Sequence, residues 1–486
     1  MRYLICFLLF FIQITLTFCQ GLTELNAQTW VIGQNTVLKF NNSGDVQKVS
    51  QSASSQFSGS EGVASISDTN GKLLFYTDGH KLFDKNNKVL LNMILPSFGS
   101  SSTTQGCIFI PSIENTLHIY MFSISASSGK FYLSVIDTTK GSDSAVVIKA
   151  GRLISDSISE QMCAVHHSDK NAIWVTVRNF GERAFYSYLI SSNGFDSVPV
   201  KSFTGFNTKN SYVLGYMKYS ANGKFLAWAN NSNNIVQLFS FNNKTGHHKL
   251  ICTIRGVQDP YGIEFSPNNQ FLYVAGYGLV QLDLRKLERE YIASNYTVLF
   301  RDSNCSTFKC PISAIQRAPG NVLYFCKQYS DNYIGKITKP DLKGLACLVS
   351  DNEVDLLSAQ SGEGLPNFIA SIFSVIEDSI EIPQDSFEVE LGAYGSPFFA
   401  NVFTPNNDLF NDTYTVDCKN NFIYNFTVYN RWGQIVFQQN NCSDVLAWDG
   451  KINGIEAAAG VYFFTCEYSS FEESRKVKNG FFELIR

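Results

Sequence analysis

Few residues in this sequence have the type and spacing of an enzyme site. The six histidines are His80, His118, His166, His167, His247 and His248. The sequence has no His-Glu-x-x-His, no Gly-x-Ser-x-Gly and no phosphate loop, so the common local signatures of hydrolases and nucleotide enzymes are absent. Adjacent residues of a strand face opposite sides, so His166 and His167 cannot both enter one metal site. A hydrogen-bonded structural histidine at a turn is the favoured interpretation, and we predict no metal, no cofactor and no catalytic residue.

Three polar residues form the best candidate binding site. Lys218, Glu264 and Gln316 occupy the same register of three repeated strands, between apolar residues of the opposite strand face. If these strands lie side by side, the three side chains converge and could bind a ligand. The alternative, which we favour, is that they are solvated or pair with one another and hold neighbouring repeats in register.

The strands that carry these residues belong to a pattern that returns through residues 30–370. Each copy has a strand, a polar turn with Asn or Gly, an aromatic-rich second strand and a third strand. Clear copies occupy residues 64–76, 217–239 and 261–283, and weaker ones begin near Cys107, Cys163 and Ile315. The turns recur every 45 to 55 residues, roughly the length of one four-stranded propeller blade.

These repeats predict a β-propeller over residues 28–370 in an all-β chain. Six copies are visible; residues 30–40 read as a detached strand pair, and residues 345–369 as its missing partner. Pairing the first segment with the last would close the ring and leave no sheet edge open. We therefore predict seven blades, with six or eight as alternatives, and expect the first strand of each blade to line a central channel.

The tail of the chain predicts a separate small β-sandwich over residues 398–486, joined to the propeller by a linker at 371–397. Alternation places Phe422, Tyr424, Phe426 and Val428 on one strand face. Trp432 and Trp448 are interpreted as core aromatics. A sandwich of about 90 residues has a usual size for an immunoglobulin-like fold.

Four motifs mark this tail. They are Phe403-Thr404-Pro405-Asn406-Asn407-Asp408-Leu409-Phe410-Asn411-Asp412, Asn430-Arg431-Trp432-Gly433, Trp448-Asp449-Gly450 and Gly460-Val461-Tyr462. Their order and spacing resemble the gliding-motility-associated C-terminal domain, which is the type B sorting domain of the Bacteroidetes type IX secretion system. The resemblance implies a bacterial protein that is handled by the type IX machinery and ends up secreted or on the outer-membrane surface.

The first of these motifs departs from the family in one loop. The usual Asn-Gly-Asp-Gly is replaced by Asn406-Asn407-Asp408-Leu409, and Leu adopts left-handed backbone conformations poorly. Asn406, Asp408 and Asp412 have the alternate spacing of a calcium loop. Asn411, however, stands where such a loop needs Gly, so we predict no calcium here.

A second resemblance covers the propeller. Residues 61–79, 100–105 and 364–369 are similar to the propeller that commonly precedes type B sorting domains in Bacteroidetes. That propeller family has no generally established activity, so the resemblance names no reaction.

The N-terminus reads as a secretory signal over residues 1–19. Arg2 is followed by an apolar run to Phe18 and then by Cys19 and Gln20, and the run is shorter than a spanning helix needs. Acylation of Cys19 is the alternative, which the bulk of Phe18 disfavours. No later segment is long and apolar enough to cross a bilayer.

Composition excludes some partners and limits the chemistry of the cysteines. With 38 Lys plus Arg against 42 Asp plus Glu and no basic stripe, nucleic acid and anionic membranes are not expected partners. Cys305 and Cys310 are the closest pair for a disulfide. Four other cysteines lie in apolar strands and are expected to be buried free thiols: Cys107, Cys163, Cys252 and Cys326. No two pairs of cysteines have zinc-ligand spacing.

The sequence thus predicts an exported propeller that binds a protein or glycan and has no catalysis of its own. The alternative is a secreted propeller enzyme, a polysaccharide lyase or hydrolase, with its site in the central channel. A cluster of His and carboxylates on several first strands would favour the enzyme, and only scattered members of such a cluster are found.

Overall fold

The computed structural model divides the chain into two compact units, Met1–Leu391 and Gly392–Arg486. It describes residues 22–93, 99, 101–125, 128–138, 146–207, 213–300, 312–327, 332–373, 379–391, 399–406, 412–417, 421–442, 445–470 and 475–486. The predicted secretory signal and the Cys305–Cys310 pair therefore lie outside the described residues.

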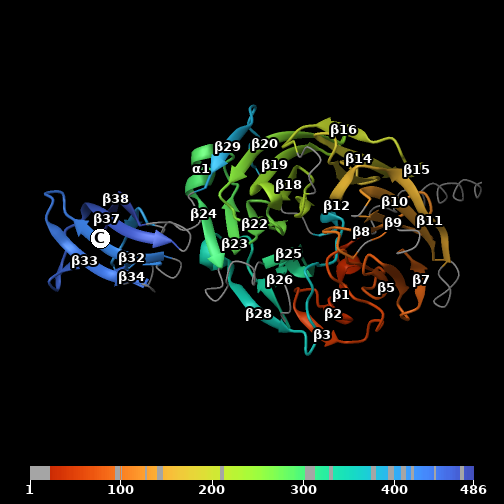
Figure 1. The fold of residues 1–486 in the computed structure, drawn as a ribbon, viewed down its shortest axis with the longest axis horizontal. Coiled ribbons are helices and arrows are strands. Elements are labelled where there is room, and N and C mark those ends of the chain that lie inside the picture. Colours follow the sequence, from red (N-terminus) through yellow and green to blue (C-terminus); the bar gives the residue numbers. More distant parts are fainter. Residues whose placement is uncertain are drawn as a thin grey trace, which may run out of the picture. The chain divides into compact units, whose positions relative to one another are not determined.

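The first unit forms seven sheets in its described residues, arranged as a ring of blades (Figure 1). The first three sheets contain β1 (Thr29–Ile32), β2 (Thr36–Phe40) and β3 (Val46–Ser50); β4 (Ala64–Ser67), β5 (Leu73–Thr77), β6 (Lys81–Asp84) and β7 (Val89–Asn92); and β8 (Cys107–Pro111), β9 (His118–Ser125), β10 (Lys130–Asp137) and β11 (Val146–Ser155). The fourth contains β12 (Ile158–His166), β13 (Ile173–Asn179), β14 (Ala184–Ser191), β15 (Gly194–Phe195) and β16 (Val200–Phe203).

The remaining three blades continue around the ring in sequence order. They contain β17 (Met217–Tyr219), β18 (Phe225–Asn230), β19 (Ile235–Asn242) and β20 (His247–Arg255); β21 (Ile263–Phe265), β22 (Phe271–Ala275), β23 (Leu279–Asp283) and β24 (Tyr296–Phe300); and β25 (Ile312–Arg317), β26 (Leu323–Lys327), β27 (Tyr333–Ile337) and β28 (Val349–Asp355). The short helices are η1 (Glu24–Ala27), η2 (Asn231–Asn233), α1 (Arg289–Ser294), η3 (Pro319–Asn321), η4 (Gly344–Cys347) and η5 (Ala370–Ile372).

The first strand of each blade lies at the centre of the ring, as the repeats predicted. Neighbouring inner strands contact one another in the order β1, β4, β8, β12, β17, β21 and β25. The polar turn after the inner strand needs a left-handed residue, which Gly71 (φ +76°), Gly223 (φ +68°) and Asn269 (φ +59°) supply in three blades. The propeller fold is therefore confirmed, with seven blades.

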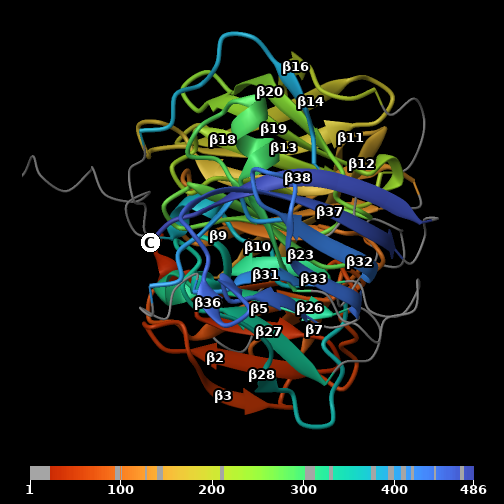
Figure 2. The ribbon, with the colours of Figure 1, turned by 90° about the vertical axis from the view of Figure 1, so that its left-hand side faces the viewer.

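The way in which the ring closes differs from the prediction. The first sheet holds three strands in the described residues and takes none from residues 345–369, which instead supply β28 to the seventh sheet. The first and last blades meet through side chains: Lys336 Nζ donates to Asp45 Oδ1 at 2.6 Å, and the Tyr324 hydroxyl donates to the Gly44 carbonyl at 2.8 Å. Figures 1 and 2 both place β28 beside β3.

Residues 360–373, here called the closing segment, cross the centre of the ring after β28 (Figure 1). The Gln34 amide donates to the Gln360 carbonyl, and the Ala314 amide of β25 donates to the Glu363 carbonyl. On the far side, Asn367 Nδ2 donates to the Met162 carbonyl of β12 at 2.8 Å. Because β12 and β25 belong to the fourth and seventh blades, the segment must pass through the central channel.

Glycine allows this passage, and apolar side chains hold it. A Cβ on Gly364 would lie 1.8 Å from the Glu61 carbonyl oxygen, so only glycine fits at that point. Leu365, Phe368 and Phe373 are buried, and the Phe368 ring lies 6.1 Å from that of Trp30 in β1. The channel is therefore filled by the chain's own residues at this level.

The fifth blade gains a further strand from the segment that follows. β29 (Phe387–Glu390) pairs in parallel with β20, from Cys252 against Phe387 to Arg255 against Glu390. Val389 is fully buried. Part of the predicted linker at 371–397 therefore forms a strand that extends the outer edge of this blade.

The second unit is a small β-sandwich. One sheet has the order β30 (Val402–Phe403), β38 (Lys476–Leu484), β37 (Gly460–Ser470), β32 (Asn421–Tyr429) and β33 (Ile435–Cys442). Shorter sheets pair β31 (Tyr414–Asp417) with β34 (Val445–Trp448) and β35 (Lys451–Ile452) with β36 (Ile455–Glu456). The core is aromatic: the rings of Tyr414 and Phe482 stack at 3.9 Å, and Phe403 lies 5.5 Å from Trp448.

Two expectations for the sandwich were wrong. The register of β32 shifts between Ile423 and Asn425, so Ile423, rather than Tyr424, shares the core face with Phe426 and Val428. Trp432 is not a core residue; it is 76% exposed in the turn between β32 and β33.

The closing segment provides the first test of the fold. Phe368→Ala should lower the free energy of unfolding of the propeller by about 3 to 5 kcal/mol, because it removes a ring packed in the centre of the molecule. Leu345→Ala is the matched control, since Leu345 is 75% exposed. Thermal or denaturant unfolding measures both; equal stability of the two variants would contradict a packed channel.

Candidate functional site

The three residues predicted as a site do meet, and they bind one another. Lys218 on β17 lies with its Nζ 3.4 Å from Glu264 Oε2 on β21 and donates a hydrogen bond to Gln316 Oε1 on β25. Glu264 Oε2 also accepts the Arg317 amide at 3.2 Å. All three side chains are buried.

This pairing supports the structural interpretation of the trio. A buried ammonium and a buried carboxylate are tolerated only when they are paired and hydrogen-bonded, and each of these groups already has its partners within the ring. The trio joins the inner strands of three successive blades. Its use as a ligand site stays a prediction that the geometry does not favour.

A second polar group lies where the closing segment enters the channel. Glu61, which precedes β4, accepts a hydrogen bond from the Tyr261 hydroxyl at 2.9 Å. Glu160 on β12 accepts bonds from the amide and hydroxyl of Thr104 at 3.1 and 3.2 Å. Glu363 of the closing segment lies near enough to Glu61 to act on its charge.

The electrostatics of this group are set by burial and by like charge. Burial, followed by the nearby charge of Glu363, raises the pKa of Glu61 to about 7. Burial also raises the pKa of Glu160. A carboxyl group that titrates near neutral pH can exchange protons with a ligand or with solvent.

The adjacent histidines have structural contacts, as favoured above. His166 Nδ1 lies 2.7 Å from the Ser371 hydroxyl of the closing segment, and burial lowers the pKa of His166 to about 4. His167 Nε2 lies 3.0 Å from the Lys244 carbonyl, and its Nδ1 lies 2.9 Å from Asp169. Within the described residues, no group of three His, Cys, Asp or Glu side chains could hold a metal ion.

The cysteines that the structure describes are free and buried. Burial raises the thiol pKa of Cys107, Cys252 and Cys326 to about 12, and that of Cys163 well above its usual value. These residues therefore act as small apolar side chains, as the sequence predicted.

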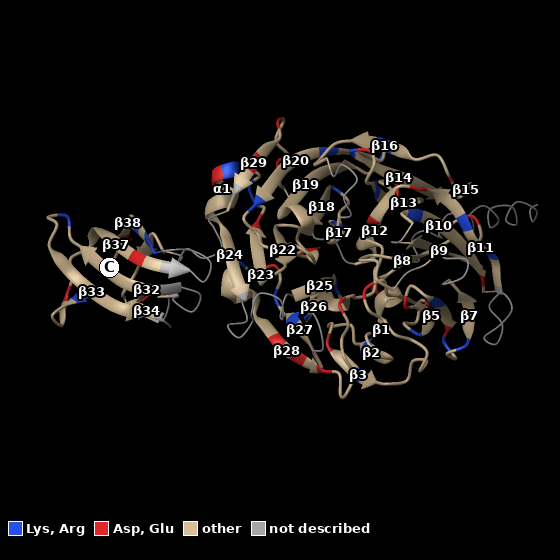
Figure 3. Cartoon of the chain, in the orientation of Figure 1, with Lys and Arg blue, Asp and Glu red and all other residues tan. Residues whose placement is uncertain are grey.

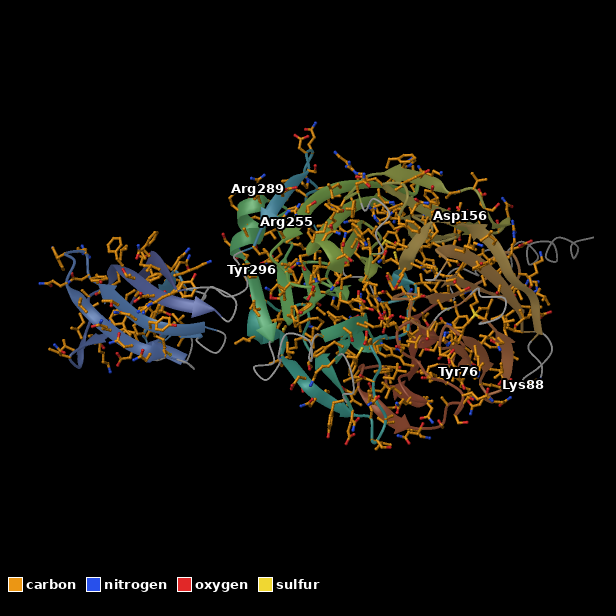
Figure 4. All side chains as sticks on the ribbon, viewed as in Figure 1. Tyr76, Lys88, Asp156, Arg255, Arg289 and Tyr296 are labelled. Atoms are coloured by element: carbon orange, nitrogen blue, oxygen red, sulfur yellow. The ribbon has the colours of Figure 1, made fainter. Side chains whose placement is uncertain are left out.

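A polar surface pocket lies between the third and fourth blades, where sequence reasoning found nothing. Its volume is about 550 Å³. It is lined by Ile154, Ser155, Asp156, Ser157, Asn179, Gly181, Glu182, Tyr186, Tyr188, Ser197, Pro199 and Lys201. Asp156, labelled in Figure 4, belongs to the turn between β11 and β12, and the other residues come from β11, from β13, β14 and β16, and from the turns beside these strands.

Hydrogen bonds hold the polar side chains of this pocket in place. The Tyr186 hydroxyl donates to Glu182 Oε2 at 2.7 Å, and Lys201 Nζ lies 3.6 Å from the same oxygen. Asn179 Oδ1 accepts the Glu182 amide at 2.6 Å. The Tyr186 hydroxyl and the Lys201 ammonium group both contact Glu182 Oε2, so the position of this carboxylate is fixed by its neighbours.

The pocket offers donors and acceptors in nearly equal measure. Hydroxyl groups, carboxylates, an amide and one ammonium group surround a space in the usual range for small-molecule sites. The surface around it has mixed charge, with Lys and Arg interspersed among Asp and Glu (Figure 3). A neutral ligand rich in hydroxyl groups fits such a lining better than an apolar or highly charged one.

The motif residues of the sandwich have two kinds of role. Trp448 is buried, and its Nε1 donates to the Lys451 carbonyl. The Asp449 carboxylate accepts a hydrogen bond from the Lys451 amide. Gly450 has φ +72° and packs against the Phe403 ring. Tyr462 is buried, and its hydroxyl donates to the Ala458 carbonyl. These residues build the core and its turns.

The Asn430-Arg431-Trp432-Gly433 motif forms a tight turn that presents Trp432 to solvent. Asn430 Oδ1 accepts the amides of Trp432 and Gln434 at 3.0 Å each, and Gly433 has φ +78°. Arg431 lies 5.4 Å from the Trp432 ring. Asp408 and Asn411 lie outside the described residues.

Arg486 joins two of the motif loops to the segment that follows β36, a role that the sequence did not suggest. Its guanidinium donates to the carbonyls of Gly450, Ala457 and Pro405 at 3.1, 3.2 and 3.4 Å. It also lies 3.1 Å from Glu456. A single arginine gives no periodic signal, so only the structure reveals these contacts of Arg486.

Two further motif residues lie in turns. The Asn406 amide donates to the Thr404 carbonyl, and Gly460 has φ +139° beside the Arg431 guanidinium.

Comparison with known proteins identifies the second unit. Residues 398–484 match the family described as the CHU_C type IX secretion signal domain. No curated protein matches the sequence. Among the described residues, no helix has the length and apolar character to cross a membrane.

Solved structures with similarity to the chain include three Bacteroides proteins. A candidate 6-phosphogluconolactonase from Bacteroides uniformis is 16% identical, with 70% of this chain and 99% of that chain covered and a TM-score of 0.43. One from Bacteroides fragilis is 13% identical, with 69% and 96% covered and a TM-score of 0.40. The extracellular domain of a candidate hybrid two-component system from B. thetaiotaomicron is 12% identical, with 95% and 55% covered and a TM-score of 0.38.

The raised pKa of Glu61 predicts a pH effect on stability. A folded-state pKa of about 7 against an ordinary value of 4.5 means that the folded chain holds the proton more tightly. The resulting stabilisation is complete below pH 4.5 and is lost as the pH rises through 7, with a total of up to about 3 kcal/mol.

Glu61→Gln keeps an acceptor for Tyr261 and removes the titration. The variant and the wild type should therefore melt at similar temperatures at pH 5, and the variant should melt several degrees higher at pH 8. Calorimetry from pH 5 to pH 8 measures the difference in melting temperature between the two proteins. The other titrating groups are the same in both proteins, so their effects cancel in this difference. Parallel pH profiles for the two proteins would contradict the assignment.

Proposed function

We propose that this chain, whose C-terminal unit is a type IX secretion signal domain, is an exported β-propeller that binds a saccharide. The family match to residues 398–484 carries the export part of the proposal. Export begins with the predicted signal at residues 1–19, passes through the periplasm and ends in secretion or at the outer-membrane surface. The type IX machinery is its partner for the last step.

The surface pocket between the third and fourth blades is the binding site in this proposal. Its lining combines Glu182, Asp156, Asn179 and Lys201 with several hydroxyl groups, which match the alternating donors and acceptors of a sugar ring. The pocket holds a few sugar rings and is too confined for a folded protein partner. Of the two ligand classes predicted, the glycan is therefore favoured over the protein.

A secreted enzyme that acts on polysaccharide is the second candidate. The observation in its favour is Glu61, whose pKa of about 7 is suited to a general acid. Against it, the closing segment runs through the channel so close to Glu61 that a Cβ on Gly364 would clash with the Glu61 carbonyl oxygen, which leaves little room for a polymer. Cleavage of a polysaccharide by the purified chain, abolished in Glu61→Gln, would favour the enzyme.

Deletion of residues 392–486 tests the export route. This boundary keeps β29 in the fifth blade, so the propeller unit stays complete. In a Bacteroidetes host, the full chain should appear outside the cell and the truncated chain should remain in the periplasm. Cell fractionation with mass spectrometry locates both forms, and circular dichroism confirms that the truncated form folds. Equal secretion of the two would contradict a sorting role for this unit.

Binding of purified protein to immobilised neutral glycans tests the pocket. Loss of one carboxylate hydrogen bond in Asp156→Ala or Glu182→Gln should weaken binding of any glycan found by about tenfold, the effect of roughly 1.4 kcal/mol. Glu290→Gln is the matched control, because Glu290 is exposed on α1, away from the pocket lining. Unchanged affinity in the pocket variants would place the site elsewhere.

A further inference from the structure

The outer face of the sandwich carries a row of apolar side chains across four strands. Tyr429 on β32 pairs with Ile435 on β33 and with Phe463 on β37, and Phe463 pairs with Phe481 on β38. These four residues are here called the apolar row. With a spacing of about 4.8 Å between neighbouring strands, the row is about 14 Å long.

The apolar row is exposed, although the same strands already fill the core with their other face. Ile435 is 58% exposed, Phe463 47% and Phe481 64%, while Tyr429 is half-buried. A sheet with one solvated face normally alternates apolar and polar residues along its strands. Here the sheet is apolar on both faces along this one line.

The neighbouring line of residues is polar, so the row has a sharp border. Thr427 pairs with Gln438 and Thr465, and Thr465 pairs with Asn479. At the other end, the turn beside the Tyr429–Ile435 pair presents Trp432, which is 76% exposed. On the side away from Thr465, Val461 pairs with Glu483 and is 39% exposed, so it extends the apolar surface. An apolar surface with polar and charged neighbours is typical of a protein-binding site.

We propose that the apolar row and Trp432 form the surface by which the type IX machinery recognises this cargo. This inference rests on the export route proposed above. All five residues belong to the segment that matches the secretion signal family, and a signal must be read from the surface of the folded module.

The size and charge of the surface favour this occupant over a second copy of the chain. Four side chains and one tryptophan cover a few hundred Å² on one molecule, whereas each subunit of a stable dimer buries about 800 Å². Exposed charges of both signs flank the row, with Glu483 two residues from Phe481 on β38 and Arg431 beside Trp432, so long-range attraction contributes little. A small apolar contact suits a cargo that must be released after translocation.

The test replaces Ile435, Phe463 and Phe481 with threonine together, which keeps good strand formers on an exposed face. The matched control is Val477→Thr, because Val477 is 62% exposed on the same face of β38. It lies four residues from Phe481, with the polar Asn479 between them on that face. Melting temperatures of the purified proteins establish that both fold. Secretion from a Bacteroidetes host is then measured by fractionation and mass spectrometry.

The triple variant should accumulate in the periplasm, with at least tenfold less protein outside the cell, while Val477→Thr is secreted like the wild type. Normal secretion of a folded triple variant would overturn the proposal. Deletion of residues 392–486, run in parallel, distinguishes failure of the apolar row from failure of the export proposal. If the truncated chain is also secreted, the export role of the C-terminal unit is wrong. A concentration-dependent dimer that only the triple variant loses, with secretion unchanged, would assign the row to self-association.

Discussion

The centre of the ring is the constraint on which the propeller depends. Seven inner strands converge there, and each sheet is too small to stay folded with its inner edge in water. The closing segment meets this demand, because it bonds to the first, fourth and seventh blades through Gln360, Asn367 and Glu363. Closure is thus achieved by a segment that ties distant blades together through the channel, rather than by a strand shared between the first and last blades.

Filling the channel changes where ligands can bind. Lys218, Glu264 and Gln316 are already saturated by one another, and the closing segment occupies the space beside Glu61. Room for a ligand is therefore sought on the periphery, where polar side chains meet solvent. The pocket around Glu182 is such a place, since its side chains are ordered by Tyr186, Asn179 and Lys201 but still face solvent.

Sequence patterns predicted the features that repeat and missed those that occur once. The strand–turn–strand repeat located the inner strands and placed Lys218, Glu264 and Gln316 together, because each copy has the same period. The closing segment, the register shift in β32 and the contacts of Arg486 are single events that depend on long-range packing. The pocket was missed for the same reason: its lining comes from strands and turns of two different blades, with no shared spacing.

Trp432 shows how a motif can hold two kinds of information. Trp448 and Phe403 are motif residues because the core needs them: they are buried, and their rings lie 5.5 Å apart. Trp432 contributes nothing to that core, yet Asn430 and Gly433 fix its turn with two hydrogen bonds and a left-handed backbone. A rigid turn that holds an indole in water costs solvation free energy and gains no packing within the module. Such an arrangement is expected where the folded surface is itself what a partner reads.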